Sequence, residues 1–399
     1  MLPLDDIKVV DLSRVLAGPW CTMTLGDLGA EIWKIESPAE GDDTRQWKPP
    51  EVAGISTYYL AANRNKRSIA LDLKHQDGQA IVKALIAKAD VLVENMRAGT
   101  LERFGLGWEA ARAINKRLIY CAISGYGRDS PAASRAGYDA VIQAESGLMS
   151  ITGEAEGEPT KHGVAITDLV TGMNATQAIL AALIARGRTG EGQFIDVALL
   201  DGAVSLLANI GSNYLNTGKP PRRFGNAHPT VVPYQTFHTG QGRFVLACGN
   251  DLQFRLICRE VIGRPELADD PRYRTNTARV ANRDTLIPLL EQVFATRPAA
   301  HWLSALWAAG VPAGVIHDLP DVFASPEVTG RELVQRVAHP TIGEVALVRS
   351  PLRLAGTPIA TPTAPPLLGE HTEAILRDVL GKSGPEIARL AASGAVRLA

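Results

Sequence analysis

Short apolar runs alternate with helical patterns along the first half of the chain. Ile7–Leu12 is a β-branched run, a helical pattern follows as far as Leu28, and Glu31–Glu36 is a second apolar run. Strands that alternate with helices in this way predict a parallel sheet with helices on both faces. The same order predicts further strands at Ser68–Leu73, Val91–Glu94, Arg117–Ser124 and Gln193–Val197, and helices at Gly78–Lys88, Asp168–Ala185 and Leu200–Leu215.

The pattern changes at Asn216–Pro229, a stretch rich in Pro and Gly that is typical of a linker. Beyond it, short strands and helices predict a small α+β domain, and the chain becomes extended from about Asp321. Because 399 residues exceed what one core usually organises, two domains are expected. The prediction is an α/β fold with a Rossmann-like large domain at 1–220, a small α+β domain inserted at 221–325, and a return to the large domain at 326–399.

The charge balance and the cysteines limit the classes of binding partner and site that are expected. Lys plus Arg (41) nearly cancels Asp plus Glu (42), which argues against binding to nucleic acid or to an anionic membrane and favours small molecules. The four cysteines form no CxxC pair and have no His at metal-ligand spacing, so reduced thiols in a cytoplasmic protein without a metal site are expected. The apolar pattern Met173–Ala185 is shorter than the about 20 residues of a membrane span, so a buried helix is expected.

The β-α-β opening invites a dinucleotide-binding interpretation, which the glycines contradict. Gly18, Gly26 and Gly29 do not form GxGxxG, so the turn that holds a pyrophosphate is missing. Neither GxSxG nor a Walker A motif is present. A nicotinamide-dependent dehydrogenase, a simple serine hydrolase and an NTPase are therefore disfavoured.

Asp168 in GVAITDLVTG precedes an apolar helix and has two interpretations. It can be an ordinary helix cap. Alternatively, the helix dipole keeps its carboxylate ionised beside free backbone N–H groups, so that it can attack a thioester. The glycine-bearing segments Gly125–Gly127 and Gly249–Asn250 are candidates for amides that stabilise an oxyanion. From the residues alone, both interpretations of Asp168 stay open.

A series of ordered motifs covers nearly the whole chain, from Leu4 to about Leu380. They include LDDIKVVDLSRVLAGPW, GDDTR, NRNKRSIALDLK, ADVLVENMRAGTLERFGLG, GYGRDSP, AGYDAV, SGLMSITG, GVAITDLVTG, RTGEGQFIDVALLD and PPLLGEHT. In these motifs the chain resembles the class III CoA-transferases. GDDTR, the STYYL and NRNKRS segments, and HPTVVPYQTF are most similar to the succinyl-CoA:glutarate type.

The resemblance implies an interlocked homodimer and an enzyme that moves CoA from an acyl-CoA, here succinyl-CoA, to a free dicarboxylic acid. CoA is then a substrate and product, and no cofactor is permanently bound. The family's GxxxxD pattern maps the nucleophile to Asp168, five residues after Gly163. The implied intermediates are an aspartyl acyl anhydride and an aspartyl-CoA thioester. Gly249 marks the candidate loop that closes over them and excludes water.

Binding residues carry over by position. For CoA the resemblance implies Leu16, Ala17, Leu71, Lys74, Asn95, Met96, Arg103, Arg135 and Tyr138. The cations among them suit the phosphates of CoA, although each also fits an ordinary surface charge. For the distal carboxylate of the acid, the candidates are Arg45, Arg64 and His228, and Trp47 is a candidate wall of the acyl pocket, although each can instead be structural.

Two alternatives remain. In the related α-methylacyl-CoA racemases a His occupies the position of Tyr138, and a phenol with a pKa near 10 is a poor base at neutral pH. Tyr138 is instead a catalytic candidate that orients the thioester or the anhydride by hydrogen bonding. Solvent deuterium incorporation at the α-carbon would identify a racemase or epimerase. A non-catalytic CoA-binding module is the second alternative, and it would keep its function after Asp168→Ala.

Overall fold

The computed structural model describes residues 1–399, which form two compact units. Unit 1 comprises Met1–Leu148, His162–Gly218 and Pro326–Ala399, and unit 2 comprises Met149–Lys161 and Lys219–Ser325. The longer part of unit 2, Lys219–Ser325, corresponds to the small domain expected at 221–325. Unit 2 also includes Met149–Lys161, which the sequence analysis had assigned to the large domain. After Ile151 the segment consists of small and polar residues, so the hydrophobic pattern did not separate it from the large domain.

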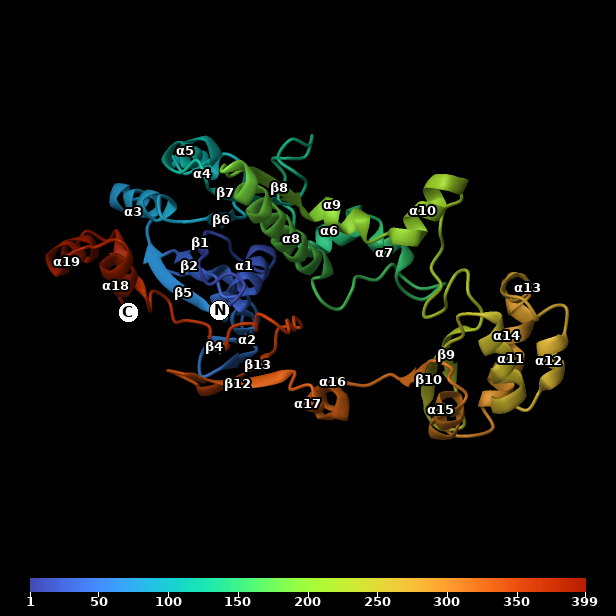
Figure 1. Ribbon diagram of the computed structural model, residues 1–399. Helices are drawn as coiled ribbons and strands as arrows, with labels where there is room; N and C mark the ends of the chain where they lie inside the picture. The colour runs from blue at the N-terminus through green and yellow to red at the C-terminus, as the bar shows by residue number, and fades with distance from the viewer. The chain divides into compact units, whose positions relative to one another are not determined.

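Unit 1 is built on a seven-stranded sheet with the order β14-β5-β2-β1-β6-β7-β8 (Figure 1). All neighbouring strands are parallel except β14, which pairs antiparallel with β5 at the edge. The strands are β1 (Lys8–Asp11), β2 (Glu31–Glu36), β5 (Lys66–Leu71), β6 (Val91–Glu94), β7 (Ile119–Ser124), β8 (Phe194–Ala198) and β14 (Val396–Arg397). Buried β-branched runs explain the strands, because a parallel sheet covered on both faces needs apolar residues on both sides.

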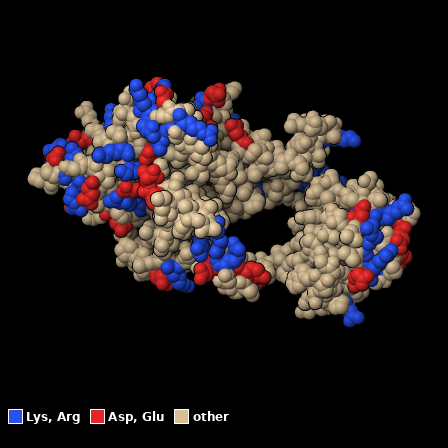
Figure 2. Space-filling view, viewed as in Figure 1, with Lys and Arg blue, Asp and Glu red and all other residues tan.

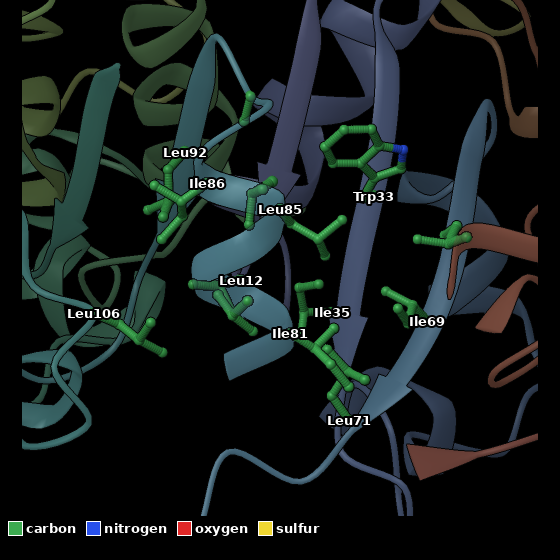
Figure 3. Close-up of a cluster of buried hydrophobic side chains, with 14 of the residues drawn as sticks. Leu12, Trp33, Ile35, Ile69, Leu71, Ile81, Leu85, Ile86, Leu92 and Leu106 are labelled. Atoms are coloured by element: carbon green, nitrogen blue, oxygen red, sulfur yellow. The ribbon is translucent and has the colours of Figure 1, made fainter. Parts of the chain in front are cut away.

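In the central strands β1, β2, β6 and β7, alternate residues enter two separate cores. In β1, Val10 belongs to the core on one face of the sheet and Val9 to the core on the other. Figure 3 shows part of the first core, in which strand residues such as Trp33 and Ile35 lie against Ile81 and Leu85 of α3. This face is covered by α3 (Gln76–Ile86), α5 (Trp108–Ile114), the π-helical turn η3 (Ile375–Val379) and α19 (Gly384–Ala392).

The second face is covered by α1 (Ala17–Asp27), α6 (Asp139–Glu145), α8 (Ile166–Thr189) and α9 (Leu199–Ser205). α1 and α8 pack closely because Gly172 has no side chain: a Cβ there would lie 2.6 Å from the carbonyl oxygen of Ala17. Ala175, Ile179 and Ala182 of α8 are buried. Each large apolar side chain buried in this way contributes roughly 1.5–3 kcal/mol to folding.

α8 is longer than the predicted helix Asp168–Ala185 and longer than the apolar core expected at Met173–Ala185. By length and composition alone it is sufficient to cross a membrane, with a mean hydropathy of 1.3. In unit 1 it contacts α1, α6, α9 and strands β7 and β8, but only 39% of its most apolar window is buried, so the expectation of a buried helix is met only in part.

The predicted helix Leu200–Leu215 is wrong as a single element. The chain forms α9 and then α10 (Ala208–Thr217), with a break at Ala208, whose φ is 41°. The remaining elements of unit 1 are η1 (Asp43–Gln46), β3 (Glu51–Val52), β4 (Ile55–Ser56), α2 (Thr57–Ala62), α4 (Thr100–Arg103), α17 (Pro326–Gly330), β12 (Val334–His339), β13 (Gly343–Val348) and α18 (Thr372–Ala374), and α7 (Leu148–Ile151) spans the boundary between the units.

Unit 2 has its own aromatic core on a three-stranded antiparallel sheet with the order β11-β10-β9. Phe237, Phe244, Phe294 and Trp302 contact one another, with ring centroids 5.0 to 6.1 Å apart. The elements are β9 (Tyr234–His238), β10 (Arg243–Ala247), α11 (Asp251–Leu256), the π-helical turn η2 (Ile257–Val261), α12 (Pro265–Asp269), α13 (Asn276–Ala281), α14 (Arg283–Phe294), α15 (Ala299–Ala308), β11 (Ala313–Val315) and α16 (Leu319–Ala324).

The surface carries both signs of charge. In the view of Figure 2, Lys and Arg lie interspersed with Asp and Glu. This face therefore shows no region covered by one sign of charge alone, in keeping with the near-equal totals of 41 basic and 42 acidic residues in the chain.

Candidate active site

A pocket of about 280 Å³ opens at the carboxyl edge of the sheet in unit 1. The strand order reverses between β1 and β6, because the chain runs from β1 outward to β2 and β5 and then returns to β6, β7 and β8. In open α/β sheets this reversal leaves a crevice that binds ligands. The loops after β1, β6 and β7 line it, together with Asp43, Asp168 and Leu199.

The loop after β1 is held in an unusual conformation. Val15 has φ 71°, a left-handed value that is strained for a β-branched residue. Asn95 fixes the preceding residue from both sides: its Oδ1 accepts from the backbone N–H of Arg14 (2.9 Å), and its Nδ2 donates to the Arg14 carbonyl (2.7 Å). The Val15 N–H donates to Asp42 (3.3 Å). Asn95 therefore connects the loops after β1 and β6.

Two buried ion pairs lie next to this loop and hold it in place. Lys34 donates to Asp42 (2.8 Å) and to the carbonyl of Ser13 (3.1 Å), and Lys66 donates to Asp11 (3.1 Å). All four charged side chains of these two pairs are fully buried. Burial alone would raise the pKa of Asp42, but the charge and hydrogen bond of Lys34 and the hydrogen bonds from Thr44 together outweigh burial and lower that pKa to about 2. Removing one partner would leave an unpaired buried charge, which typically costs about 3–5 kcal/mol.

The loop after β7 brings Tyr138 to the pocket. Gly125 and Gly137 approach so closely that a Cβ on Gly125 would lie 2.8 Å from the Cα of Gly137. Both residues line the pocket, so small residues are required at this crossing. Tyr138 follows with 60% of its surface exposed, and Arg135 lies over the ring of Tyr126 at 4.5 Å while pairing with Glu145.

Asp168 lies in the first turn of α8, not at its cap. The helix begins at Ile166, and its cap residue is Ala165, whose side chain makes no capping hydrogen bond. The cap interpretation of Asp168 is therefore wrong. Instead Asp139, the first residue of α6, accepts from the backbone N–H of Thr167 (2.8 Å) and from its hydroxyl (2.6 Å).

The surroundings of Asp168 disfavour its charged form. Burial, and then the negative charge of Asp139, raise the pKa of Asp168 to about 7. The expectation that the helix dipole keeps this carboxylate strongly ionised is thus wrong. Burial first, and then Asp168 and Asp139, raise the pKa of Tyr58 to about 12, so this phenol lies within electrostatic range of both carboxylates. The ring of Tyr58 meets Trp47 edge-on.

The structure brings seven predicted residues together around this pocket. They are Leu16, Ala17, Asn95, Met96, Arg135, Tyr138 and Asp168. Leu71 is 1% exposed and lies in the hydrophobic core shown in Figure 3, where it has no free surface for CoA. Lys74 and Arg103 are exposed and are not among the lining residues.

Two arginines that were candidates for carboxylate binding are engaged inside unit 1. Arg45 donates twice to Glu36 (both 2.8 Å) and also to the hydroxyl of Tyr59 (2.6 Å). Arg64 forms a bidentate pair with Asp27. These buried partners assign both arginines to the stability of the unit, so we do not retain them as substrate ligands.

The other predicted site residues, Trp47, His228 and Gly249, differ in their exposure and in their hydrogen bonds. Trp47 is 40% exposed beside Tyr58. His228 and Gly249 belong to unit 2. The Nδ1 of His228 accepts from the Thr230 N–H (3.1 Å), and the Gly249 N–H donates to Gln253 (2.7 Å). The Gly249 amide is therefore occupied in this conformation.

Sequence reasoning missed four residues that matter here. Arg14 and Arg97 are exposed cations that line the pocket, Asp139 raises the pKa of Asp168 after burial does, and Tyr58 is a phenol whose own pKa is raised by burial and then by Asp168. Asp139 stands next to Tyr138 in AGYDAV, and Arg97 stands next to Met96, so proximity to predicted residues was the available signal. No group of three or more His, Cys, Asp or Glu residues is placed to hold a metal ion.

Comparisons with known proteins show which proteins this chain resembles. The chain is 46% identical over 396 residues to a succinyl-CoA:glutarate CoA-transferase of Mus musculus, covering 99% of this chain and 91% of the relative. It is 44% identical over 383 residues to a succinate–glutarate CoA-transferase of Agrobacterium fabrum (strain C58 / ATCC 33970), covering 94% and 96% of the two chains. A crystal structure of a CAIB/BAIF family protein from Brucella suis matches with a TM-score of 0.83 and 46% identity, covering 95% and 99%.

The family model of CoA-transferase family III matches residues 4–372. This range contains every residue of the pocket, and it includes β1 to β13 of the strands described above. The chain therefore belongs to CoA-transferase family III and is a class III CoA-transferase.

Proposed function

We propose that this enzyme transfers CoA from succinyl-CoA to a free dicarboxylic acid and that Asp168 is its nucleophile. The observation that carries the proposal is a partly buried carboxylate with a pKa of about 7 in a pocket at the switch point of the sheet. Such a carboxylate is ionised in about half of the molecules at neutral pH. The named activities of the relatives supply the donor and the class of acceptor.

The chemistry needs only Asp168 and the two substrates. An oxygen of Asp168 attacks the thioester carbonyl, the C–S bond breaks, and CoA leaves as a thiolate from a mixed anhydride. The thiolate then attacks the aspartyl carbonyl, releasing the donor acid as a carboxylate and leaving an aspartyl-CoA thioester. The acceptor carboxylate attacks this thioester, and the same two steps run in reverse on the acceptor. Each step exchanges one anion for another, so no net proton is consumed.

The walls of the pocket suit these steps. Arg14, Arg97 and Arg135 are exposed cations at the pocket and can pair with the phosphates of CoA. The backbone around Gly125 and Gly137 can approach the thioester closely because neither residue has a side chain. Tyr138, mostly exposed, is available to donate a hydrogen bond to the reacting carbonyl.

The remaining expectations belong to the same proposal. The enzyme is proposed to act in the cytoplasm as an interlocked homodimer, in which unit 2 is the inserted domain. The segment around Gly249 is proposed to close over the anhydride, which hydrolyses when water reaches it.

Mass spectrometry tests the proposal directly. The protein is incubated with succinyl-CoA alone and its intact mass is measured, and then glutarate, itaconate, mesaconate, citramalate and oxalate are added as a pool. We expect an adduct of the mass of CoA less water on Asp168, and a new CoA ester of one acid. Asp168→Asn should lose both products, whereas the exposed control Asp6→Asn should keep them.

Two results would contradict the proposal. Transfer activity that survives in Asp168→Asn would exclude this residue as the nucleophile. Incorporation of solvent deuterium at the α-carbon of an acyl-CoA, without exchange of acids, would instead indicate a racemase.

A further inference from the structure

The first turn of α8 is capped by a residue from another helix. Ala165 has no polar side chain, so the N–H groups that begin the helix need an acceptor from elsewhere. Asp139 supplies it through Oδ1, which accepts from both the backbone N–H and the hydroxyl of Thr167. Thr167 itself is fully buried, and the next residue is Asp168.

The second oxygen of Asp139 extends the same connection. Its Oδ2 accepts from the side-chain amide of Gln143 (2.6 Å), and the Oε1 of Gln143 accepts from the backbone N–H of His162 (2.7 Å). Gln143 is 1% exposed. Two side chains of α6 therefore fix both ends of the segment His162–Thr167, which leads into the nucleophile.

We propose that Asp139 is the positioning residue of Asp168: through Thr167 it fixes the direction of the nucleophilic carboxylate, and its charge sets the pH at which that carboxylate becomes reactive. Asp139 does not line the pocket, so it acts on the substrate only through Asp168. This inference rests on the proposed function and adds the residue that controls its nucleophile.

Asp139 is the charged neighbour that raises the pKa of Asp168, in addition to the effect of burial. The elements that pack against α8 are α1, α6, α9, β7 and β8. Their other titratable side chains, together with those at the pocket and on α2, are Cys21, Asp27, Glu145, Asp201, Tyr120, Cys121, Asp196, Arg14, Asp43, Arg97, Arg135, Tyr138, Tyr58 and Tyr59. Among these, Tyr58 responds to the charge of Asp168, but a neutral phenol does not raise the pKa of a carboxylate by repulsion.

Three variants separate the two roles of Asp139. Asp139→Asn keeps an oxygen acceptor for Thr167 and removes the charge, and its amide nitrogen replaces the oxygen that accepts from Gln143. Thr167→Val keeps the charge and the side-chain volume but removes the hydroxyl donor. Asp139→Ala removes both the charge and the acceptor. Asp6→Asn removes one exposed negative charge from unit 1 and serves as the matched control.

The readout is the rate at which the aspartyl-CoA species forms in a single turnover with succinyl-CoA, measured by quenching and intact mass from pH 5.5 to 9. In the parent enzyme the rate should rise with a midpoint near pH 7, because only the ionised carboxylate attacks. Asp139→Asn should lower the midpoint by about one unit. Thr167→Val should leave the midpoint unchanged and lower the plateau rate about tenfold, and Asp139→Ala should do both.

The KM for succinyl-CoA should change less than twofold in all three variants, since none of the altered residues lines the pocket. A midpoint that stays at its parent value in Asp139→Asn, or a plateau that stays unchanged in Thr167→Val, would overturn the corresponding role of Asp139. Should Asp139→Ala fail to fold, the other two variants decide. If the parent enzyme forms no CoA adduct, the proposed function fails; if it does and the variants behave identically, only this inference fails.

Discussion

The indole of Trp47 meets the ring of Tyr58 edge-on, with the ring centroids 5.1 Å apart and the planes at 75°. The charge of Asp168 contributes, after burial, to the raised pKa of Tyr58, so this aromatic pair lies near the nucleophile. Trp47 is 40% exposed, and Tyr58 is half-buried. An apolar side chain that stays this exposed is available to a ligand.

Replacing Trp47 should therefore affect the acceptor acid more than the fold. We expect Trp47→Ala to raise the KM for the acceptor about fivefold to tenfold, because the apolar contact that is lost corresponds to roughly 1–1.4 kcal/mol of binding free energy. The melting temperature should change by only a few degrees. Steady-state kinetics at saturating succinyl-CoA check this, with Trp307→Ala, an exposed tryptophan of unit 2, as the control. An unchanged acceptor KM would remove Trp47 from the acyl pocket.

Removing the charge of the nucleophile should stabilise the protein. The pKa of Asp168 is about 7 in the folded state, against an ordinary value of 3.8 that applies to the unfolded chain. The folded state therefore binds the proton more tightly. Stability therefore falls as the pH rises from about 4 to about 7 and stays lowered above that range. Asp168→Asn escapes this loss, and we expect a gain of about 2 kcal/mol at pH 8, about half of the full conversion because the side chain is partly exposed.

Urea denaturation of the parent enzyme and Asp168→Asn at pH 4.5 and at pH 8 measures the difference. The gain should be small at pH 4.5 and full at pH 8. An Asn variant that is less stable at pH 8 would show that Asp168 makes a favourable interaction when it is ionised.

Arg45 should behave as a structural residue. Arg45→Ala leaves Glu36 buried without its bidentate partner, and we expect a loss of about 3–5 kcal/mol in the free energy of unfolding. Arg45→Lys should rescue it only partly, because one ammonium cannot replace two parallel hydrogen bonds. Denaturant unfolding gives the stability, and the acceptor KM of the Lys variant should remain within twofold. A large rise in that KM with unchanged stability would return Arg45 to the substrate site.

The cations at the pocket should bind the phosphates of CoA. Arg97→Ala and Arg135→Ala should each raise the KM for succinyl-CoA about fivefold to tenfold, and the effect should shrink at high ionic strength. Arg188→Ala is the matched control, because Arg188 is exposed near the C-terminal end of α8, about 30 Å along the helix from Asp168. Salt-dependent kinetics measure both effects. Equal KM values in the pocket and control variants would mean that these arginines do not contact CoA.

Periodicity predicted the six parallel strands of the sheet, most of which are buried on both faces, but it did not predict the short antiparallel edge strand β14. β2 and β6 have the predicted bounds, and β5 is offset by two residues because Lys66 and Arg67 continue the strand with polar side chains. It did not suffice for Leu200–Leu215, where the apolar pattern continues across the break at Ala208. A helix pattern records which face is buried, and it does not record where the backbone changes direction.

The site was predictable where a loop follows a strand. Leu16, Asn95 and Tyr138 follow β1, β6 and β7, and parallel strands bring their carboxyl ends to one edge. The roles of Arg45 and Arg64 were not predictable, since Arg64 pairs with Asp27 across 37 positions and a charged residue looks the same in sequence whether or not its partner is buried. The anchoring of Thr167 by Asp139 is likewise a contact across 28 positions.

The chain passes between the two units four times, after Leu148, Lys161, Gly218 and Ser325. Unit 2 therefore cannot be cut out as one continuous piece, nor exchanged with that of a relative at a single pair of breakpoints. The second passage ends at His162, just before the helix that carries Asp168. Any recombination that replaces unit 2 must rejoin the chain within a few residues of the nucleophile, so the two units are expected to have been inherited together.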